Sequence, residues 1–318
     1  MIKPILSIVT PTREGFSEHW LKKLLEVKGD LEFILVHPPG MTKPSIDDPR
    51  VQQINSPLRG EVIQRITGLT NASGTYTLSL NCDEYLTPDI LEIVLQYFKR
   101  FPNSWVMRLS RKEFDYGRKA ELEAPWSKIS PIDELKICGK SLGNHKSYDK
   151  NKDLYEIPIA PLENQFDWRC FIRERSDHHG PHLENFDKKV WQTSMVQESL
   201  KDLMPMLNLG GPFKYVPFWT LDRLLGLYVQ AKFYEKDQVI GHLLPLPEQI
   251  RLEDNPPEYR RSPLRLYILA EVLLLKKFPQ YGYFWNLIIN HIRDFPLIAA
   301  KVIKEQIPTK QPQIEKLS

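Results

Sequence analysis

The chain has 318 residues and a mass of 37.3 kDa, which allows one large domain or a domain with a substantial appendage. Its formal net charge of +3, with a pI near 8.5, is too small and too evenly spread to indicate a nucleic acid as the main partner. Three widely spaced cysteines, Cys82, Cys138 and Cys170, match no zinc pattern and cannot all pair, so we expect a reducing, cytoplasmic environment.

The sequence does not show the pattern of a signal peptide or of a transmembrane helix. The N-terminal apolar run breaks at Pro11, which leaves it too short for a signal peptide. The longest apolar run, at residues 266–275, is interrupted by Glu271 and is shorter than the roughly 20 residues that cross a bilayer. We therefore expect a soluble protein, or one that binds peripherally to the inner face of a membrane.

The first hundred residues alternate between strand and helix patterns. Apolar runs typical of strands lie at residues 4–10, 31–36, 51–54 and 76–80, and amphipathic helix patterns lie at 17–29, 60–74 and 88–100. The first run, from Pro4 to Thr10, is apolar on both faces, which is typical of a central parallel strand. This alternation predicts an α/β fold, in which a mostly parallel sheet has helices on both faces.

The middle of the chain has a weaker pattern. One more strand is expected at residues 105–109, whereas residues 111–190 are dense in charge and proline, with short β-like pieces at 156–159 and 170–172. This segment contains His178, His179 and His182, a set of side chains that can bind a transition metal. Because a Gly-Pro pair separates them and no helix orients them, a polar loop is the favoured interpretation.

Helix patterns dominate the last third of the chain. A strand and a helix are expected within 191–209, a helix with an apolar stripe at 221–231, and three helices at 263–278, 281–293 and 296–306. The last three have broad apolar faces flanked by Lys and Arg. They are either an appendage packed on the sheet or a basic amphipathic surface that rests on an anionic membrane. The tail after Pro308 is expected to be disordered.

An acidic turn follows the strand expected at residues 76–80. Asn81, Asp83 and Glu84 stand where that strand ends, and Thr87-Pro88-Asp89 has the pattern of a helix start. Open α/β sheets bind ligands at the carboxyl ends of their strands. The turn is therefore either a polar loop exposed to water or a site for a hard cation, Mg²⁺ or Mn²⁺, which carboxylates and substrate phosphates bind together.

A further acid, Asp222, is expected in the first turn of the helix near Leu221. An acid there stabilises the helix dipole by about 0.3 to 1 kcal/mol, which is sufficient to explain its position when it is considered alone.

The order of these motifs resembles a family 2 glycosyltransferase of the GT-A fold. Residues 7–12 are similar to the family's first strand and nucleotide-contacting loop. Residues 64–68 are similar to its Ala-Arg-Asn-x-Gly helix, and residues 72–76 are similar to the segment that follows that helix. Asn81-Cys82-Asp83 is similar to the Asp-x-Asp motif. Gly210-Gly211-Pro212-Phe213 followed by Leu221-Asp222 is similar to the Gly-Gly-Phe segment and the Glu-Asp pair that contains the catalytic base.

The resemblance implies that a sugar is moved from a nucleotide-diphosphate sugar, in the first place a UDP-sugar, to an acceptor hydroxyl by a metal-assisted, inverting single displacement. It implies that Asp83 binds the divalent cation, Mn²⁺ or Mg²⁺, and that Asp222 is the catalytic base. The residues expected to bind the nucleotide sugar are Thr10, Pro11, Thr12, Glu14, Arg65, Asn81 and Asp83. The acceptor is a glycan, a lipid-linked molecule or a small molecule, and residues 111–190 and Trp219 are candidates for its side of the site.

The same resemblance divides the chain into three parts. Residues 1–257 form a GT-A-like domain, with a nucleotide-binding half at 1–110 and an acceptor half at 111–257. Residues 258–307 form a helical appendage, through which a peripheral membrane contact is expected, and residues 308–318 form a disordered tail.

Three positions depart from the family pattern. His37 stands where the family has an aspartate that recognises the base, Asn81 replaces the first acid of Asp-x-Asp, and Leu221 replaces the Glu before the base. These departures motivate an alternative, a catalytically inactive GT-A-like binding or scaffold protein. A nucleotidyltransferase or methyltransferase is disfavoured, because the sequence has neither a Gly-x-Gly-x-x-Gly loop nor a Walker motif.

Overall fold

The protein is described from a computed structural model. The structure describes residues 3–139, 149, 151–162, 165–172, 181–207, 218–254 and 268–306. Several sequence expectations concern residues outside these ranges: the histidines at 178 and 179, the segment 210–213 and the tail 308–318. The side chains of His182 and Trp219 are likewise not described.

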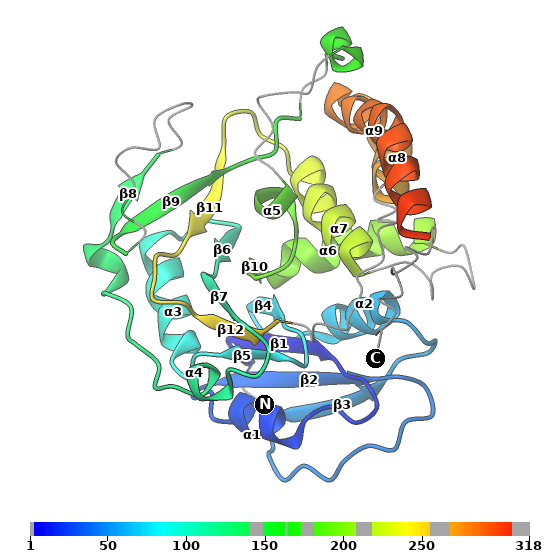
Figure 1. Ribbon diagram of the computed structural model, residues 1–318. Helices are drawn as coiled ribbons and strands as arrows, with labels where there is room; N and C mark the ends of the chain where they lie inside the picture. The colour runs from blue at the N-terminus through cyan, green and yellow to red at the C-terminus, as the bar shows by residue number, and fades with distance from the viewer. Residues whose placement is uncertain are drawn as a thin grey trace, which may run out of the picture.

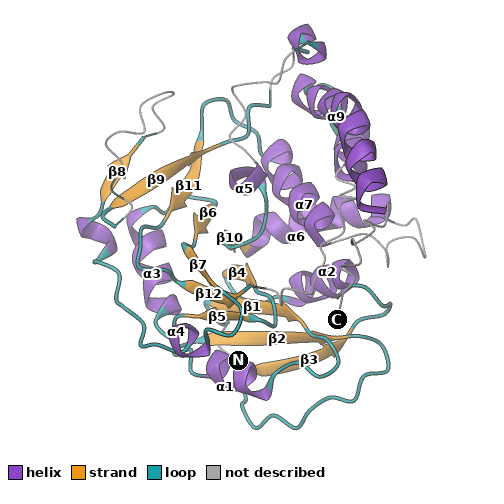
Figure 2. Cartoon of the chain, in the orientation of Figure 1, coloured by secondary structure: helices purple, strands orange, loops and turns teal. Residues whose placement is uncertain are grey.

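A large sheet forms the centre of the molecule (Figures 1 and 2). In spatial order its strands within the described residues are β3 (Val51–Asn55), β2 (Leu31–His37), β1 (Leu6–Pro11), β4 (Tyr76–Ser79), β10 (Lys189–Gln192), β6 (Val106–Arg108), β11 (Val239–Leu243), β9 (Asp153–Pro158) and β8 (Lys136–Cys138). Neighbouring strands from β3 to β4 are parallel, whereas β10 runs antiparallel to both of its neighbours. The sheet is parallel again between β6 and β11 and between β8 and β9. The expected mostly parallel sheet is confirmed.

Helices cover both faces of the sheet, as the alternating pattern predicted. The helices α2 (Glu61–Asn71), α6 (Thr193–Leu203) and α7 (Phe218–Lys232) bury apolar side chains in one core, among them Val62, Val196 and Leu224. The helices α1 (Glu18–Leu25) and α3 (Ile90–Arg100) do the same in a second core, with Trp20 and Val94. Two apolar cores therefore hold the sheet between them, and the carboxyl ends of the parallel strands β1 and β4 lie at the same edge of the sheet.

A second, small sheet lies beside that edge, and the sequence patterns did not predict it. Its strands are β5 (Glu84–Leu86), β12 (Ile250–Glu253) and β7 (Arg111–Phe114). It joins chain segments more than 100 residues apart, and the short helix α4 (Lys119–Leu122) contacts it. The indole Nε1 of Trp20 donates a hydrogen bond to the carbonyl of Glu84 at 2.8 Å, which attaches this sheet to α1.

Two helices, not three, end the described part of the chain. They are α8 (Ile268–Lys277) and α9 (Gly282–Gln306), and Pro296 lies inside α9 instead of separating two helices. Leu273, Leu274 and Phe284 belong to the same buried core as α7, so the helices are packed against the sheet domain. No helix within the described ranges combines the length and apolarity that crossing a bilayer requires.

Three smaller expectations were also wrong. Residues 170–172 belong to a short helix, η3 (Trp168–Phe171), and its end, instead of a strand. Helix α3 begins after Asp89, so Thr87 is not its N-cap. Helix α7 begins at Phe218, which puts Asp222 in the second turn, where the helix dipole has little effect.

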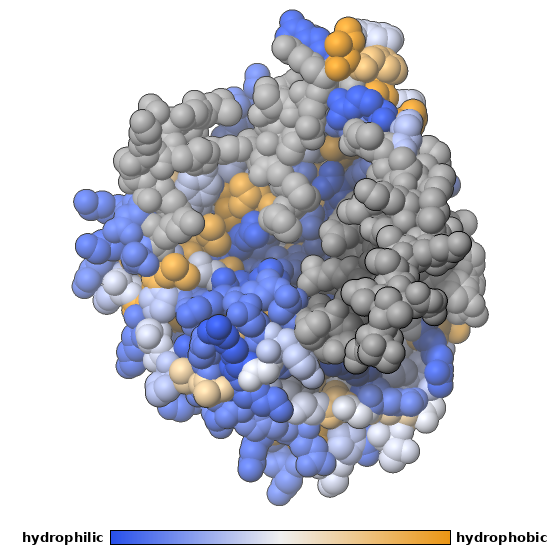
Figure 3. Space-filling model, in the orientation of Figure 1, coloured by the Kyte–Doolittle hydropathy of each residue, from blue (hydrophilic) through white to orange (hydrophobic). Residues whose placement is uncertain are grey.

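The remaining short elements are η1 (Ile132–Glu134), η4 (Met204–Leu207) and α5 (Pro181–Glu184). The surface over α1 and α4 is largely hydrophilic, whereas hydrophobic and hydrophilic residues are mixed at the top of the molecule (Figure 3). Trp168, Phe171 and Ile172 are exposed, with exposed fractions of 73, 56 and 89%.

Candidate functional site

Four of the predicted binding residues line one cavity at the carboxyl ends of β1 and β4. This cavity, which we call the edge cavity, has a volume of about 190 Å³ and is lined by Pro11, Thr12, Asn81 and Asp83. Arg13, Glu61, Gln64 and Cys82 complete its wall. The parallel arrangement of β1 and β4 brings the two loops together, because parallel strands end at the same edge of a sheet.

Gln64 joins the ends of β1 and β2. Its Nε2 donates hydrogen bonds to the carbonyls of Thr12 at 2.8 Å and Val36 at 2.7 Å. The sequence analysis placed Gln64 in a family motif without giving it a role. Its position one helical turn into α2, directly after the sheet edge, explains how a helix side chain reaches two strand ends.

His37 is fully buried at the end of β2. Its Nδ1 lies 2.7 Å from Thr12 Oγ1 and its Nε2 lies 2.9 Å from Gln53 Oε1, so both ring nitrogens have partners. Burial lowers the pKa of His37, which favours the neutral imidazole. The residue that replaces the expected aspartate therefore supplies no charge and stabilises the loop that carries Thr12.

Arg65 is a buried cation behind the edge cavity, with only 2% of its surface exposed. It donates hydrogen bonds to Ser79 Oγ, to Asn81 Oδ1 and, at 2.9 Å, to Glu61 Oε1. Asn81 also donates its backbone N–H to Glu84 Oε2 at 2.9 Å. The side chain that replaces the first acid of the motif is thus an acceptor for Arg65.

Asp83 is the most accessible acid of the turn. It is exposed, and it lines both the edge cavity and a larger neighbouring cavity of about 590 Å³. Surrounding atoms exclude water from part of the carboxyl and raise the pKa of Asp83, while Arg13 opposes this effect.

The donor set of the edge cavity fits a hard cation that substrate oxygens help to bind. Asp83 and Glu61 supply carboxylates to the same cavity. Among the residues described by the structure, no group of three or more His, Cys, Asp or Glu side chains is placed to hold a metal ion. Mg²⁺ typically uses one or two carboxylates together with phosphate oxygens, so this set suits an ion that arrives with a nucleotide.

Two predicted binding residues lie elsewhere. Thr10 is fully buried in β1, and its hydroxyl has no hydrogen-bond partner among the described residues. Glu14 is exposed on the loop after β1, and it does not belong to the wall of the edge cavity. The structure therefore groups Pro11, Thr12, Asn81 and Asp83, with Arg65 behind them, and leaves these two apart.

Asp222 is a buried carboxylate on α7, with 5% of its surface exposed. It accepts hydrogen bonds from Asn185 Nδ2 at 2.6 Å and from the backbone N–H of Asp187 at 2.5 Å. Burial and the charge of Asp187 raise the pKa of Asp222 to about 7, while the hydrogen bond from Asp187 and the cations Lys189 and Arg65 oppose this rise. Electrostatic interaction with Arg65 connects it to the edge cavity, although Asp222 does not line that cavity.

The sequence analysis missed the charged groups that surround Asp222. Lys189 is fully buried and donates hydrogen bonds from Nζ to the carbonyls of Leu183, at 2.8 Å, and Asn185. It thereby holds the segment whose Asn185 and Asp187 contact Asp222. Burial lowers the pKa of Lys189 to about 7 and raises that of Glu84 to about 7. In the sequence Lys189 follows Asp187 and Lys188 at the start of a short strand, a charged run that gives no sign of burial or of its partners.

Comparisons with known proteins give distant structural likenesses only. No family model matches the chain, and no curated protein matches it. The crystal structure of residues 1–349 of S. aureus TarS in complex with UDP is similar to 85% of this chain, with a TM-score of 0.46 and 14% identity. A second crystal structure of residues 1–349 of S. aureus TarS is similar to 96% of the chain, with a TM-score of 0.48 and 13% identity. Its complex with UDP-GlcNAc is similar to 85% of the chain, with a TM-score of 0.43 and 14% identity.

The chain spans 65%, 76% and 66% of these three structures, which is less than two thirds for the two complexes. Likenesses at this level of identity and TM-score do not assign the chain to a family.

Proposed function

We propose that the chain is a glycosyltransferase that moves a sugar from a nucleotide-diphosphate sugar to an acceptor hydroxyl. The observation that carries the proposal is the edge cavity, where segments 11–13, 61–64 and 81–83 meet at the carboxyl edge of parallel strands. The first of these segments belongs to the first strand and loop that resemble the glycosyltransferase family, and the last is the turn that resembles its Asp-x-Asp motif. The buried acid Asp222, from the fourth motif, interacts electrostatically with Arg65 behind the same cavity.

Each residue of the edge has a role in this proposal. Asp83 would hold Mn²⁺ or Mg²⁺, which would supply positive charge against the negative charge that develops on the leaving group. The loop at Pro11 and Thr12 contacts the nucleotide, for which a UDP-sugar is the first candidate. Asn81, held by Arg65, presents its amide to the ribose or to a water.

Asp222 accepts the proton of the acceptor hydroxyl as that oxygen attacks the anomeric carbon. The bond between the acceptor oxygen and the anomeric carbon forms, and the bond from that carbon to the diphosphate oxygen breaks. The nucleoside diphosphate leaves with the electron pair, and attack from the opposite face inverts the configuration.

Titration with UDP, in the presence and absence of Mn²⁺, tests the proposal directly. We expect binding that requires the ion and that raises the melting temperature, because a ligand at 100 times its Kd stabilises the folded state by about 2.7 kcal/mol. UDP release from UDP-sugars, measured with added acceptors, then tests transfer. Absence of any ion-dependent binding of UDP, ADP, GDP or CDP would contradict the proposal.

A catalytically inactive binding protein is the second candidate. Two observations favour it. Asp222 already accepts two hydrogen bonds from within the protein. His37, which stands where the family has an aspartate, has both ring nitrogens bonded to the uncharged side chains of Thr12 and Gln53. The assay of UDP release distinguishes the two candidates. An inactive protein binds UDP, but it does not form UDP from any UDP-sugar.

A further inference from the structure

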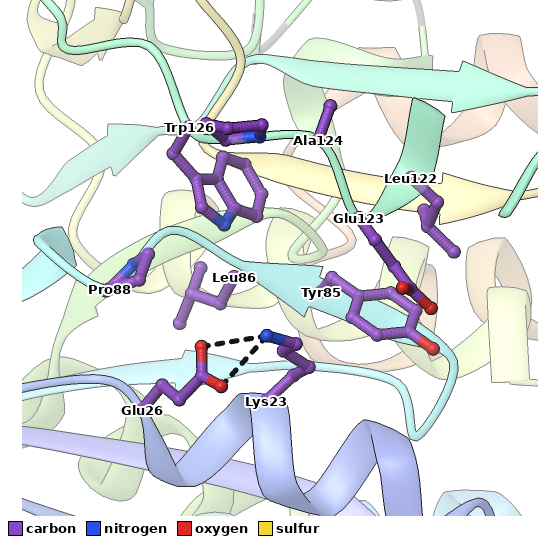
Figure 4. A pocket seen from close by; sticks show the side chains of 10 residues that line it. Lys23, Glu26, Tyr85, Leu86, Pro88, Leu122, Glu123, Ala124 and Trp126 are labelled. Atoms are coloured by element: carbon purple, nitrogen blue, oxygen red, sulfur yellow. Dashed lines mark hydrogen bonds and ion pairs between the residues drawn. The ribbon is translucent and has the colours of Figure 1, made fainter. Parts of the chain in front are cut away.

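Three cavities follow one another along the surface that begins at Asp83. The cavity of about 590 Å³ shares Arg13, Cys82 and Asp83 with the edge cavity. A cavity of about 190 Å³, between α1 and the segment 122–126, shares Tyr85 with the 590 Å³ cavity (Figure 4). A third cavity, of about 320 Å³, shares Trp126 with the second. Because neighbouring cavities share lining residues, the three lie in a row on the surface, and we call this row the aromatic groove.

Aromatic side chains mark the length of this groove. Tyr85 and Tyr116 line its largest cavity, and Trp126 lines the two cavities beyond it. Figure 4 shows the indole of Trp126 above Leu86 and Pro88, with Tyr85 at the other end of the same cavity. Rings of this kind offer flat apolar faces whose edges or hydroxyl groups still reach water, as ligands with both apolar and polar faces require.

A buried arginine holds Trp126 in place. Arg251, which is 5% exposed, stacks its guanidinium on the indole at 4.0 Å from the ring centroid. It also donates hydrogen bonds to the carbonyls of Ala124 and, at 3.3 Å, Pro125, and to Glu248 Oε1 at 2.7 Å. The segment that carries Trp126 is therefore ordered before a ligand binds, which lowers the entropic cost of binding.

The charge of the groove selects among ligands. Five carboxylates line the two cavities nearest to Asp83, and they are Glu26, Asp83, Glu123, Glu253 and Asp254. Three Lys or Arg side chains line the same cavities. Carboxylates accept hydrogen bonds from hydroxyl groups, whereas an excess of them repels phosphate and carboxylate groups of a ligand.

We propose that the aromatic groove binds the acceptor chain, and that this acceptor is an uncharged oligosaccharide. Sugar rings stack on Trp126 and Tyr85, and their hydroxyl groups donate to the carboxylates between these rings. The groove shares Asp83 with the edge cavity, so a chain bound along it ends beside the proposed binding site of the nucleotide sugar. The role of the bound oligosaccharide as an acceptor rests on the proposed function. Binding of the oligosaccharide to the groove does not depend on that function.

Binding of defined hexasaccharides, measured by calorimetry without nucleotide, tests the groove. The probes are maltohexaose, cellohexaose and chitohexaose, which are neutral, and hexagalacturonate, which is anionic. We expect at least one neutral hexamer to bind, and we expect Trp126→Ala to raise its Kd about tenfold or more through loss of stacking. Trp285→Ala, at an exposed tryptophan on α9, is the control and leaves the Kd unchanged.

A second pair of variants tests the charge. The double change Glu26→Gln and Glu123→Gln should strengthen binding of hexagalacturonate while neutral hexamers keep their Kd within about threefold. The proposal is overturned if no neutral hexamer binds the wild-type protein, if hexagalacturonate binds it more tightly than the neutral hexamers do, or if Trp126→Ala binds them normally. Titration of the wild-type protein with UDP tests the nucleotide site separately, so that failure of either proposal is seen on its own.

Discussion

At the scale of single residues, the two acids of the proposed reaction differ in their surroundings. Asp83 is exposed at the mouth of two cavities, whereas Asp222 is buried and accepts two short hydrogen bonds. An exposed carboxylate exchanges water for a metal ion at little cost, while a buried one that accepts two hydrogen bonds keeps a fixed orientation. Their different surroundings therefore suit the two roles of ion binding and proton transfer.

Replacing Asp83 by Ala should remove ion-dependent binding of UDP and leave stability unchanged within about 0.5 kcal/mol, because the side chain is exposed. Calorimetric titration with UDP and Mn²⁺ measures the first effect, and urea unfolding measures the second. Asp133→Ala, at an exposed acid of η1, is the matched control. Unchanged UDP affinity in Asp83→Ala would exclude Asp83 as the metal ligand.

Asp222→Asn should reduce transfer by about 10²- to 10⁴-fold, the usual contribution of a general base. UDP binding should persist, because Asp222 lies outside the edge cavity. The change costs stability of about 1 to 3 kcal/mol, since Asn185 and Asp187 donate to different oxygens of Asp222 and the NH₂ group that replaces one of them cannot accept. Full transfer activity in this variant would rule out Asp222 as the base.

The pH dependence of transfer should report the same carboxylate. Because the pKa of Asp222 is raised to about 7, the base is ionised only above that pH, and kcat/KM should fall about tenfold per unit below it. Asn185→Ala removes a hydrogen bond donated to the carboxylate and should move this limb to higher pH. Glu84 and Lys189 also have pKa values near 7. If the acid limb of the pH profile does not move in Asn185→Ala, the titrating group is one of these two side chains instead of Asp222.

At the scale of elements, helix α2 sets the geometry of the edge cavity. It carries Glu61, Gln64 and Arg65 along one side and packs closely on β1 and β2. The close approach depends on Gly68, because a Cβ at this position would overlap Val9 Cγ1 and lie 2.9 Å from Val36 Cγ2. The helix thus lies near enough to the sheet for Gln64 to reach the carbonyls of Thr12 and Val36.

Gly68→Ala should destabilise the protein by about 1 to 3 kcal/mol, because overpacking against two strand side chains exceeds the gain in helix propensity. Thr70→Ala, at an exposed position of the same helix, should change stability by less than about 0.5 kcal/mol. Urea unfolding of both variants measures the difference. A Gly68→Ala protein as stable as the wild type would show that α2 moves away from the sheet at no cost.

At the scale of the whole molecule, the C-terminal helices are attached to the helix that carries Asp222. Glu271 of α8 is fully buried, and it contacts Arg223 Nε at 2.7 Å and His291 Nε2 at 3.1 Å. Tyr283 of α9 donates a hydrogen bond to Glu184 Oε1 at 2.7 Å. These contacts and the shared apolar core join α8 and α9 to the neighbours of Asp222.

Glu271→Ala should therefore cost about 3 kcal/mol or more, since it breaks a buried ion pair with Arg223 by removing one partner. Glu198→Ala removes an exposed partner of Lys232 and should cost less than about 1 kcal/mol. Thermal and urea unfolding of the two variants provide the comparison. Equal, small losses would indicate that the C-terminal helices form a loosely attached unit. A membrane contact of these helices stays a prediction.

The sequence by itself determined the local elements and the order of the motifs. Strand patterns identified β1, β2 and β4, and helical periodicity identified α1, because these signals depend on residues close together in the chain. The small sheet β5-β12-β7 was not predictable, since each strand is short and its partners come from distant segments. The tertiary structure alone decided which predicted residues meet. Pro11, Thr12, Asn81 and Asp83 share a cavity, whereas Thr10 faces into the protein and Glu14 lies outside that wall. The partners of Asp222 and the support of Trp126 by Arg251 likewise arise from packing between elements, which no local pattern contains.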